Sequence, residues 1–440
     1  MKKRKRRTEE DRDHSVGFVR RQAKHARAEA FLAGKPLLIG LDLAKKRHAA
    51  WLAGRDHLPI ARFMIDHSRD GVAALLERAD RVREKHGFDR SLVFMEATSH
   101  FWANVANELE ARGVEYRTVT PLAVDRQREI EHITYAKGDY RDAELIQRLG
   151  ANGQWLHRIL EKDPLWIQLD TLAREHEALL ALEVKERTRV RSLLELVLPE
   201  LLECVKDPLG KTPRALLRRL ANPPAEIPST FAELVKRTAQ VQGYRLRYGM
   251  LRALVARLEG APSFGVERAL APTLARIGLA VDRFDLLAHQ RRGLRARLVA
   301  LYDTTPYQKH LNTIPGVVPG NHALLLGMLG DPKRYDRATC LAKFAGIEPR
   351  ENQSGKAEGS HSISHRGRSA LRHVLHRIVL GLRLSNDEFS AHLKRLMSRE
   401  KDPLAWTAAA VATANKYLHL VYRLCVDGKP YDASRLKPKS

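Results

Sequence analysis

The chain has 440 residues, and its hydrophobic fraction of 44% is sufficient for the cores of two or three domains. Its formal net charge of +25, from 77 Lys and Arg against 52 Asp and Glu, indicates a polyanionic partner. No apolar run reaches membrane-spanning length, and the three widely spaced cysteines argue against a disulfide framework or a structural zinc site. We therefore expect a cytoplasmic protein that binds nucleic acid and has no membrane partner.

The positive charge is unevenly distributed along the chain. Lys and Arg number 12 against 5 acidic residues in 1–35, 18 against 18 in 36–155, 25 against 18 in 156–305, and 22 against 11 in 306–440. We interpret residues 1–35 as a basic, disordered arm that contacts phosphates. The neutral second segment is suited to hold a metal ion. The alternative is that the surplus basic residues only solubilise helices.

Residues 36–155 are predicted to form a mixed sheet covered by helices. Apolar and β-branched runs predict strands at 37–43, 47–53, 59–65, 91–96 and 115–119. Helical periodicity predicts helices at 69–87, 100–112 and about 122–149. Three closely spaced strands indicate an antiparallel meander, and the later alternation indicates crossover units. This order of elements is that of the ribonuclease-H-like, or RuvC-like, fold.

Four carboxylates in this segment are candidate metal ligands. Asp42 and Glu96 end two predicted strands, whereas Asp139 and Asp142 lie three residues apart on a predicted helix and share one face. In this fold the strand ends and the last helix converge on one edge of the sheet. Clustered carboxylates need a cation, and their hard oxygen atoms favour Mg²⁺, for which Mn²⁺ can substitute. Because two such ions can hold both reacting oxygens of a phosphodiester, the pattern predicts a nuclease or strand-transfer site.

Residues 156–305 are predicted to be helical, with Leu, Ala, Arg and Glu at helical spacing. Proline and glycine interrupt the pattern at 207–213, 221–228 and 259–265. Two interpretations stay open for this region. It forms either a coiled coil that joins protomers or a helical bundle within one chain.

Residues 306–440 are predicted to be mainly α-helical and begin with a helix, a Gly-Pro-rich turn and a second helix. Gly316 and Gly320 of this turn could present backbone N–H groups to a phosphate, as in a helix-hairpin-helix element. A purely structural turn explains them equally well. A polar Ser/Gly loop and an Arg-rich helix follow. The candidate phosphate contacts there, which a solvated basic face would also explain, are Arg350, Lys356, Arg366 and Arg368.

Six motifs in this order resemble those of the DEDD transposases of bacterial insertion sequences, of the insertion sequence 110 family. The motifs are GLD at 40–42, FMEAT at 94–98, KGDYRDA at 137–143, IPGVVPG at 314–320, FAGIEPRENQSGK at 344–356 and SHRGRSALRHVL at 364–375. The middle of the chain matches in helical character only. One departure is Gly138, which stands where a small hydroxylated residue is common in the family.

The resemblance implies a RuvC-like catalytic domain at 36–155, a coiled-coil segment at 156–305 and a C-terminal transposase domain at 306–440. It implies Asp42, Glu96, Asp139 and Asp142 as metal ligands and Ser354 as the nucleophile. It further implies double-stranded DNA as the substrate and a structured guide (bridge) RNA as a partner. A dimer or tetramer would build a composite site from the two domains of different protomers.

We therefore predict a transposase, a recombinase that cuts and rejoins DNA through a covalent phosphoserine intermediate. Ser354 has no evident base within its own loop, so its hydroxyl would need metal held by the carboxylates. One alternative is a RuvC-like nuclease or Holliday-junction resolvase that uses water as the nucleophile. Another is a non-catalytic protein that binds nucleic acid.

Overall fold

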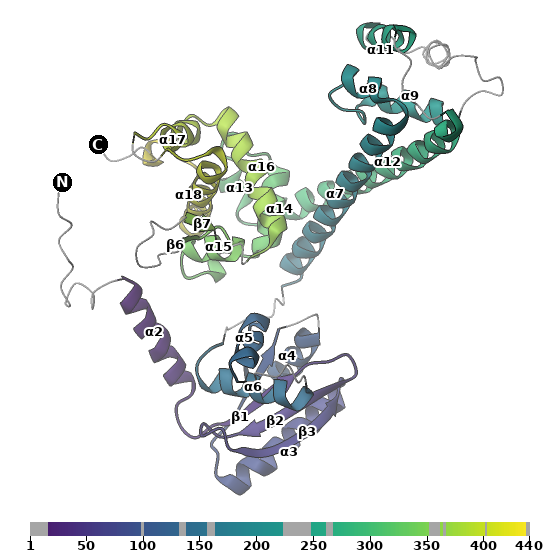
Figure 1. The fold of residues 1–440 in the computed structure, drawn as a ribbon. Helices are drawn as coiled ribbons and strands as arrows, with labels where there is room; N and C mark the ends of the chain where they lie inside the picture. Colours follow the sequence, from purple (N-terminus) through teal and green to yellow (C-terminus); the bar gives the residue numbers. More distant parts are fainter. Residues whose placement is uncertain are drawn as a thin grey trace. The chain divides into compact units, whose positions relative to one another are not determined.

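The computed structural model describes residues 16–97, 101–131, 138–155, 163–222, 248–260, 267–351, 361–363, 367–400 and 403–436. Contacts divide the chain into two compact units, Met1–Glu161 and Lys162–Ser440, and Figure 1 shows the elements of each. No helix in the described part of the chain combines the length and apolar character needed to cross a membrane.

The first unit is built on a five-stranded mixed sheet with the order β3-β2-β1-β4-β5. β1 pairs antiparallel with β2 and parallel with β4, β2 pairs antiparallel with β3, and β4 pairs parallel with β5. The predicted meander and crossover units are therefore confirmed, and β1 lies in the middle of the sheet. The strands are β1 (Leu37–Asp42), β2 (Arg47–Ala53), β3 (Pro59–Asp66), β4 (Ser91–Glu96) and β5 (Glu115–Val119).

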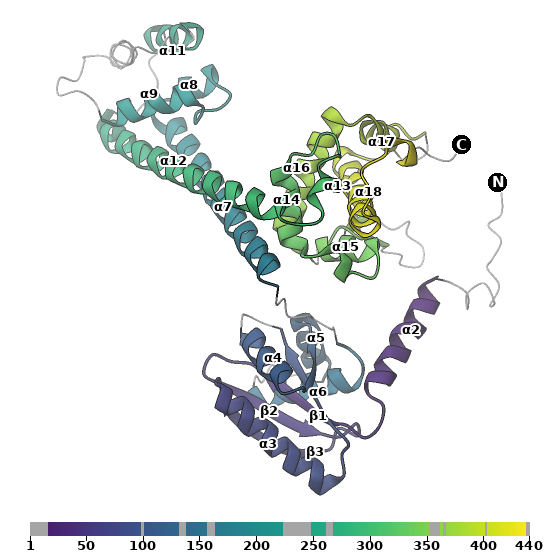
Figure 2. The same cartoon turned by 180° about the vertical axis from the view of Figure 1, so that it is seen from behind.

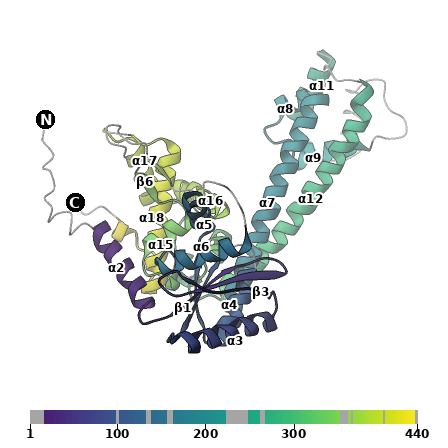
Figure 3. The same ribbon diagram turned by 60° about the horizontal axis from the view of Figure 1, so that its bottom comes forward.

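Helices cover both faces of this sheet, and the alternation of side chains in β1 shows why. Leu37, Ile39 and Leu41 point to one face and pack with α3 and α4, whereas Leu38 points to the other and packs with α6. Figures 1 and 2 show these two faces in turn, and Figure 3 shows the sheet between α3 and α6. The helices are α3 (Arg69–His86), α4 (Phe101–Ala111), α5 (Pro121–Glu131) and α6 (Asp139–Ala151).

Helix α6 lies close to the sheet because glycine replaces a side chain at two contact points. A Cβ atom on Gly40 of β1 would lie 2.0 Å from the carbonyl oxygen of Ala143 and 2.7 Å from the backbone nitrogen of Gln147. A Cβ atom on Gly150 of α6 would lie 2.3 Å from Cγ of Phe94 in β4. The backbone of α6 therefore rests directly on β1, and its end rests on an aromatic ring of β4.

The basic segment before the sheet is partly helical, where the sequence predicted a disordered arm. Residues Val16–Phe31 form α2, and the following Leu32 is 1% exposed. Arg90 donates a hydrogen bond to the carbonyl oxygen of Phe31 at 2.8 Å, and the guanidinium of Arg117 stacks on the Phe31 ring at 3.7 Å. The prediction of disorder is wrong for residues 16–31, because apolar residues at the end of the helix anchor it to the sheet. Residues 1–15 lie outside the described residues.

The second unit begins with two long antiparallel helices, α7 (Pro164–Val197) and α12 (Glu267–Asp303), which lie side by side (Figure 1). The C-terminal part of α7 and the N-terminal part of α12 share an apolar core with three shorter helices. The predicted helical character is thus confirmed for the described helices, and α7 and α12 pack within one chain. A coiled coil between protomers stays a prediction. The shorter helices are α8 (Pro199–Cys204), α9 (Lys211–Ala221) and α11 (Tyr248–Gly260).

The remaining helices form a bundle whose core extends across the boundary predicted at residue 305. Trp166 of α7 and Tyr302 of α12 are buried in the same core as Leu324, Leu375 and Tyr417. Between α15 and α16 in the chain, β6 (Pro349–Glu351) and β7 (His361–Ile363) pair antiparallel. The other elements are α13 (Gln308–Leu311), α14 (Pro319–Leu329), α15 (Ala338–Ala345), α16 (Ser369–Ser385), α17 (Asp387–Met397), α18 (Trp406–Asp427) and two short 3-10 turns, Pro332–Arg334 and Ala433–Leu436.

The Gly-Pro-rich turn between α13 and α14 is shaped by close packing. Gly316 has φ +84°, and a Cβ atom there would lie 2.6 Å from the carbonyl oxygen of Gly381. A Cβ atom on Gly320 would lie 2.5 Å from Nε of Arg295. Packing against backbone explains Gly316, whereas the neighbour of Gly320 is the end of a flexible side chain that could move. Phosphate binding at this turn stays a prediction.

We expect Gly40→Ala to destabilise the first unit by roughly 1–3 kcal/mol, the usual cost of overpacking. The new methyl group would meet backbone atoms of α6, which cannot rotate away as a side chain can. Hydrogen exchange of the α6 amides measures the effect separately from the second unit. Gly293→Ala is the control, because Gly293 lies in α12 with no neighbouring atom within 4 Å and should leave α6 unchanged. Unaltered protection of α6 in Gly40→Ala would contradict this account.

Candidate active site

The ends of β1 and β4 bring two of the candidate carboxylates together. Asp42 is the last residue of β1 and Glu96 the last residue of β4. The two strands are parallel neighbours whose register places Leu41 beside Met95, so the next residues on each strand lie side by side. Both carboxylates are half-buried at the carboxyl edge of the sheet.

Helix α6 supplies the other two carboxylates in its first turn. Asp139 is the first residue of the helix and is exposed, whereas the Asp142 side chain is only 15% exposed. Unpaired N–H groups and the helix dipole favour negative charge at this end of a helix. Because Ala143 lies against Gly40, two residues before the end of β1, the first turn of α6 is held at the same edge as the strand ends.

The electrostatics of Glu96 show that these groups influence one another. Burial, followed by the negative charges of Asp42, Asp125 and Asp142, raises the pKa of Glu96 to about 7, and the positive charge of Arg128 opposes this rise. The structure therefore brings together three of the four predicted carboxylates and adds a fourth, Asp125, from α5. Asp139, the first residue of α6, is exposed.

A partly buried ion pair between α5 and α6 completes the cluster. Arg128 donates from Nε and Nη2 to Oδ1 of Asp142 at 3.0 and 2.8 Å, and from Nη1 to Oδ1 of Asp125 at 2.9 Å. Burial disfavours the charged guanidinium, but these hydrogen bonds outweigh it and raise the pKa of Arg128. Sequence reasoning missed both residues, since an Asp and an Arg three positions apart on a polar helix usually form a surface ion pair.

The donor chemistry of this cluster fits a divalent metal ion. Carboxylate oxygens are the ligands that Mg²⁺ prefers. Burial contributes most to the raised pKa of Glu96, and the neighbouring negative charges that contribute the rest are ones that a cation would offset. As the side chains lie, the described residues contain no group of three acidic, histidine or cysteine side chains able to hold a metal. Oδ1 of Asp142 is turned towards Arg128 instead.

The predicted nucleophile and two predicted phosphate contacts, Ser354, Lys356 and Arg366, lie outside the described residues. In the sequence, Ser354 belongs to the segment that joins β6 to β7. Arg350 lies in β6, opposite Ser362 of β7. The roles predicted for these residues therefore stay predictions.

Arg368 has a structural role at the start of α16. Its Nη1 donates to Oδ1 of Asp170 at 2.7 Å and to the carbonyl oxygen of Met328 at 3.0 Å. Its guanidinium also lies over the ring of Phe344. These contacts join α16 to α7 and α14, and a phosphate contact by Arg368 stays a prediction.

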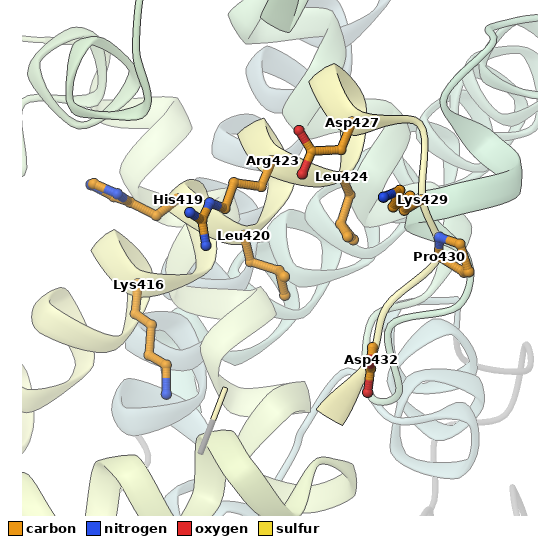
Figure 4. A pocket seen from close by; sticks show the side chains of 9 residues that line it. All are labelled: Lys416, His419, Leu420, Arg423, Leu424, Asp427, Lys429, Pro430 and Asp432. Atoms are coloured by element: carbon orange, nitrogen blue, oxygen red, sulfur yellow. The ribbon is translucent and has the colours of Figure 1, made fainter. Parts of the chain in front are cut away.

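A second candidate surface is a basic cavity of about 210 Å³ beside α18. Figure 4 shows Lys416, His419 and Arg423 along one side of this helix, with Lys429 on the segment that follows it. Burial and the nearby charge of Arg395 lower the pKa of Lys416. The lining residues are Lys416, His419, Leu420, Arg423, Leu424, Asp427, Lys429, Pro430 and Asp432.

The basic residues of this cavity differ from the arginines that join the long helices. Arg283 pairs with Glu186, and Arg291 pairs with Glu183, across α7 and α12. By contrast, Arg423 has no ion-pair partner within the described part of the chain. Burial and the charge of Arg423 also lower the pKa of His419. Basic residues therefore outnumber the two acidic residues of the lining, Asp427 and Asp432.

We expect the metal-free protein to lose stability as pH rises from about 5 to about 7.5. Glu96 binds its proton more tightly in the folded state than in the unfolded state, so deprotonation through the pKa of about 7 favours unfolding. The full effect is about 2–3 kcal/mol after allowance for solvent screening of this half-buried group, and Glu96→Gln should remove it. Urea denaturation in the presence of a chelator measures the pH dependence. Glu129→Gln, at an exposed position of α5, should keep the parent's slope. An equal slope in Glu96→Gln would contradict the assignment.

Two models of known protein families match this chain. A family model described as transposase, of the DEDD type of insertion sequence 110, matches residues 39–199. A second, described as transposase IS116/IS110/IS902 family, matches residues 308–394. The first match contains all four candidate carboxylates, and the second contains the segment with Ser354.

Curated relatives agree with these matches. The chain is 24% identical over 403 residues to the insertion element IS110 uncharacterized 43.6 kDa protein of Streptomyces coelicolor, covering 90% of this chain and 96% of the relative. It is 26% identical to the putative transposase y4pF/y4sB of Sinorhizobium fredii, over 43% of this chain and 50% of the relative. It is 28% identical to the transposase for insertion sequence element IS1111A of Coxiella burnetii, over 28% and 34% respectively. The chain therefore belongs to the insertion sequence 110 family of DEDD transposases, enzymes that cleave and transfer DNA strands.

Proposed function

We propose that this transposase moves its element by a recombination in which the carboxylate cluster holds Mg²⁺ and Ser354 attacks a DNA phosphate. The observation that carries the proposal is the meeting of Asp42, Glu96 and Asp142 at one edge of the sheet. The strand order and the helices on both faces support a ribonuclease-H-like assignment of this unit.

Each carboxylate has a distinct part in holding the metal. Asp42 and Glu96 would bind from neighbouring strand ends, which fixes their spacing, and Asp139 and Asp142 would bind from one turn of α6. When bound, Mg²⁺ or Mn²⁺ supplies Lewis acidity that stabilises charge on the phosphate oxygens. Glu96 must give up its proton to act as a ligand, so metal and proton compete for it near neutral pH.

Ser354 is the nucleophile in this proposal. Its hydroxyl is a weak nucleophile that must lose a proton to attack phosphorus. The new bond between Oγ and phosphorus would replace one phosphorus–oxygen bond of the DNA backbone and release a DNA hydroxyl group. Because the number of phosphoester bonds is unchanged, a second DNA hydroxyl can reverse the step and rejoin strands without ATP.

We expect the parent protein to form a covalent adduct with labelled element-end DNA in the presence of Mg²⁺ and guide RNA. The adduct should survive denaturation in the parent and disappear in Ser354→Ala, because the oxygen that forms the bond is absent. Ser360→Ala alters a neighbouring serine of the same segment and should keep the adduct. Asp42→Asn should lose both adduct and cleavage. Cleavage that persists in Ser354→Ala without any adduct would instead indicate hydrolysis by water.

The guide RNA and a dimeric or tetrameric assembly complete the proposal. Both come from the family resemblance, and the net charge of +25 supports a polyanionic partner. In such a system RNA pairing selects the sequence, while the protein reads backbone and shape. Omission of RNA from the adduct assay, and the mass of the protein with and without RNA, test the two parts separately.

We further propose that the basic cavity beside α18 contacts the phosphate backbone of DNA. Lys416 and Arg423 lie two turns apart on one side of α18 and present positive charge there, and His419 lies between them. Arg395 of α17 also lies near Lys416 and adds positive charge, which Glu388 of the same helix partly offsets. Backbone contacts of this kind give affinity without sequence preference.

We expect the double variant Lys416→Ala/Arg423→Ala to bind duplex DNA more weakly and with a smaller salt dependence. Each lost phosphate contact reduces the slope of log affinity against log salt by about 0.9, so the slope should fall by about 2. Fluorescence anisotropy across a salt series measures it. The control Arg292→Ala/Arg297→Ala removes the same charge from exposed positions of α12. Equal slopes for both double variants would place the phosphate contacts elsewhere.

A further inference from the structure

The positively charged guanidinium of Arg128 binds two carboxylates of the acidic cluster, Asp142 and Asp125. Two of its donors bind the same oxygen, Oδ1 of Asp142, and a third binds Oδ1 of Asp125. The side chains of Arg128 and Asp142 are each only 15% exposed. The guanidinium is therefore enclosed against the acidic cluster and does not extend into solvent.

The contacts of Arg128 also explain why the cluster is compact without a metal. Asp42, Glu96 and Asp142 would repel one another, and the positive charge of Arg128 acts against that repulsion. A guanidinium and a divalent ion that approach the same carboxylate repel each other strongly, since both are positive and only a few ångströms would separate them. Occupation of Asp142 by one cation therefore disfavours the other.

We propose that Arg128 is a positioning residue that holds Asp142 in the metal-free enzyme and must release it before Mg²⁺ binds there. This inference rests on the proposed role of Asp142 as a metal ligand. Competition from Arg128 then raises the Mg²⁺ concentration that is needed for the metal to bind Asp142. It also keeps the acidic cluster assembled until the metal arrives.

Helix α5 provides a place for the guanidinium after release. Asp125 lies one turn before Arg128 on the same helix, and its side chain is 62% exposed. Arg128 can therefore turn towards solvent and keep its bond to Asp125 while it gives up Asp142. The exchange leaves no buried unpaired charge, which would otherwise make release costly.

If Arg128 helped Mg²⁺ to bind, the effect of removing it would have the opposite sign. If Arg128 stayed on Oδ1 of Asp142 and oriented the other oxygen towards the metal, its removal would weaken Mg²⁺ binding. If Arg128 competes with the metal, its removal strengthens binding. The sign of the change in Mg²⁺ affinity therefore decides between orientation and competition.

The test is calorimetric titration of the full-length, chelator-treated protein with MgCl₂ alone, without DNA or RNA. We expect Arg128→Gln and Arg128→Ala to bind Mg²⁺ about fivefold or more tightly than the parent, the lower range of coupling between mutually exclusive interactions. Both should also melt at a lower temperature without metal and show a larger rise in melting temperature on addition of Mg²⁺. Arg126→Ala, at an exposed position of the same helix, should match the parent.

Two controls separate this inference from the proposed function. Arg128→Gln keeps a polar amide donor on a shorter, uncharged side chain, so it remains informative if Arg128→Ala does not fold. Asp42→Asn should weaken Mg²⁺ binding whatever Arg128 does, and a normal affinity in that variant would overturn the metal site itself. With Asp42→Asn weakened, an unchanged or lower affinity in folded Arg128→Gln would overturn only the role of Arg128.

Discussion

The direct contact of α6 with β1 is the constraint on which the candidate site depends. Gly40 lies two residues before Asp42, and Ala143, whose carbonyl oxygen faces it, directly follows Asp142. Any side chain on Gly40 would move the helix outward and carry its first turn away from the strand ends. The lack of a side chain at Gly40 lets α6 lie directly on β1, and this close packing fixes the distance between the carboxylates of the sheet and those of the helix.

The carboxylates that this contact brings together repel one another, and the structure shows two ways in which their negative charge is balanced. Arg128 supplies positive charge to Asp142, and the raised pKa of Glu96 allows that carboxyl group to hold a proton near neutral pH. A bound divalent ion would be a third way to balance it and would compete with both. The metal-free arrangement therefore appears as one of several charge states of a single cluster, in which a proton, a guanidinium and a metal ion can each balance the same carboxylates.

Sequence patterns predicted the five strands because apolar runs of five to eight residues, separated by turns, leave little choice of element. They also predicted that Asp42 and Glu96 share an edge, since neighbouring parallel strands end together. They did not indicate Arg128, because its partner Asp142 lies 14 residues away on another helix. They misassigned α2 for a similar reason, since its anchor to Arg117 is a tertiary contact that composition does not reveal.

The second unit shows the same limit for positive charge. The sequence predicted a phosphate contact for Arg368, yet in the structure it pairs with Asp170 of α7. Arg283 and Arg291 likewise pair with carboxylates of α7 and join α12 to it. Such pairs neutralise charge where the helices meet. Positive potential therefore remains where basic residues lack such partners among the described residues, as Arg423 does on α18. Net charge predicts that a polyanion binds, but only the pattern of ion pairing indicates which basic residues are available to bind it.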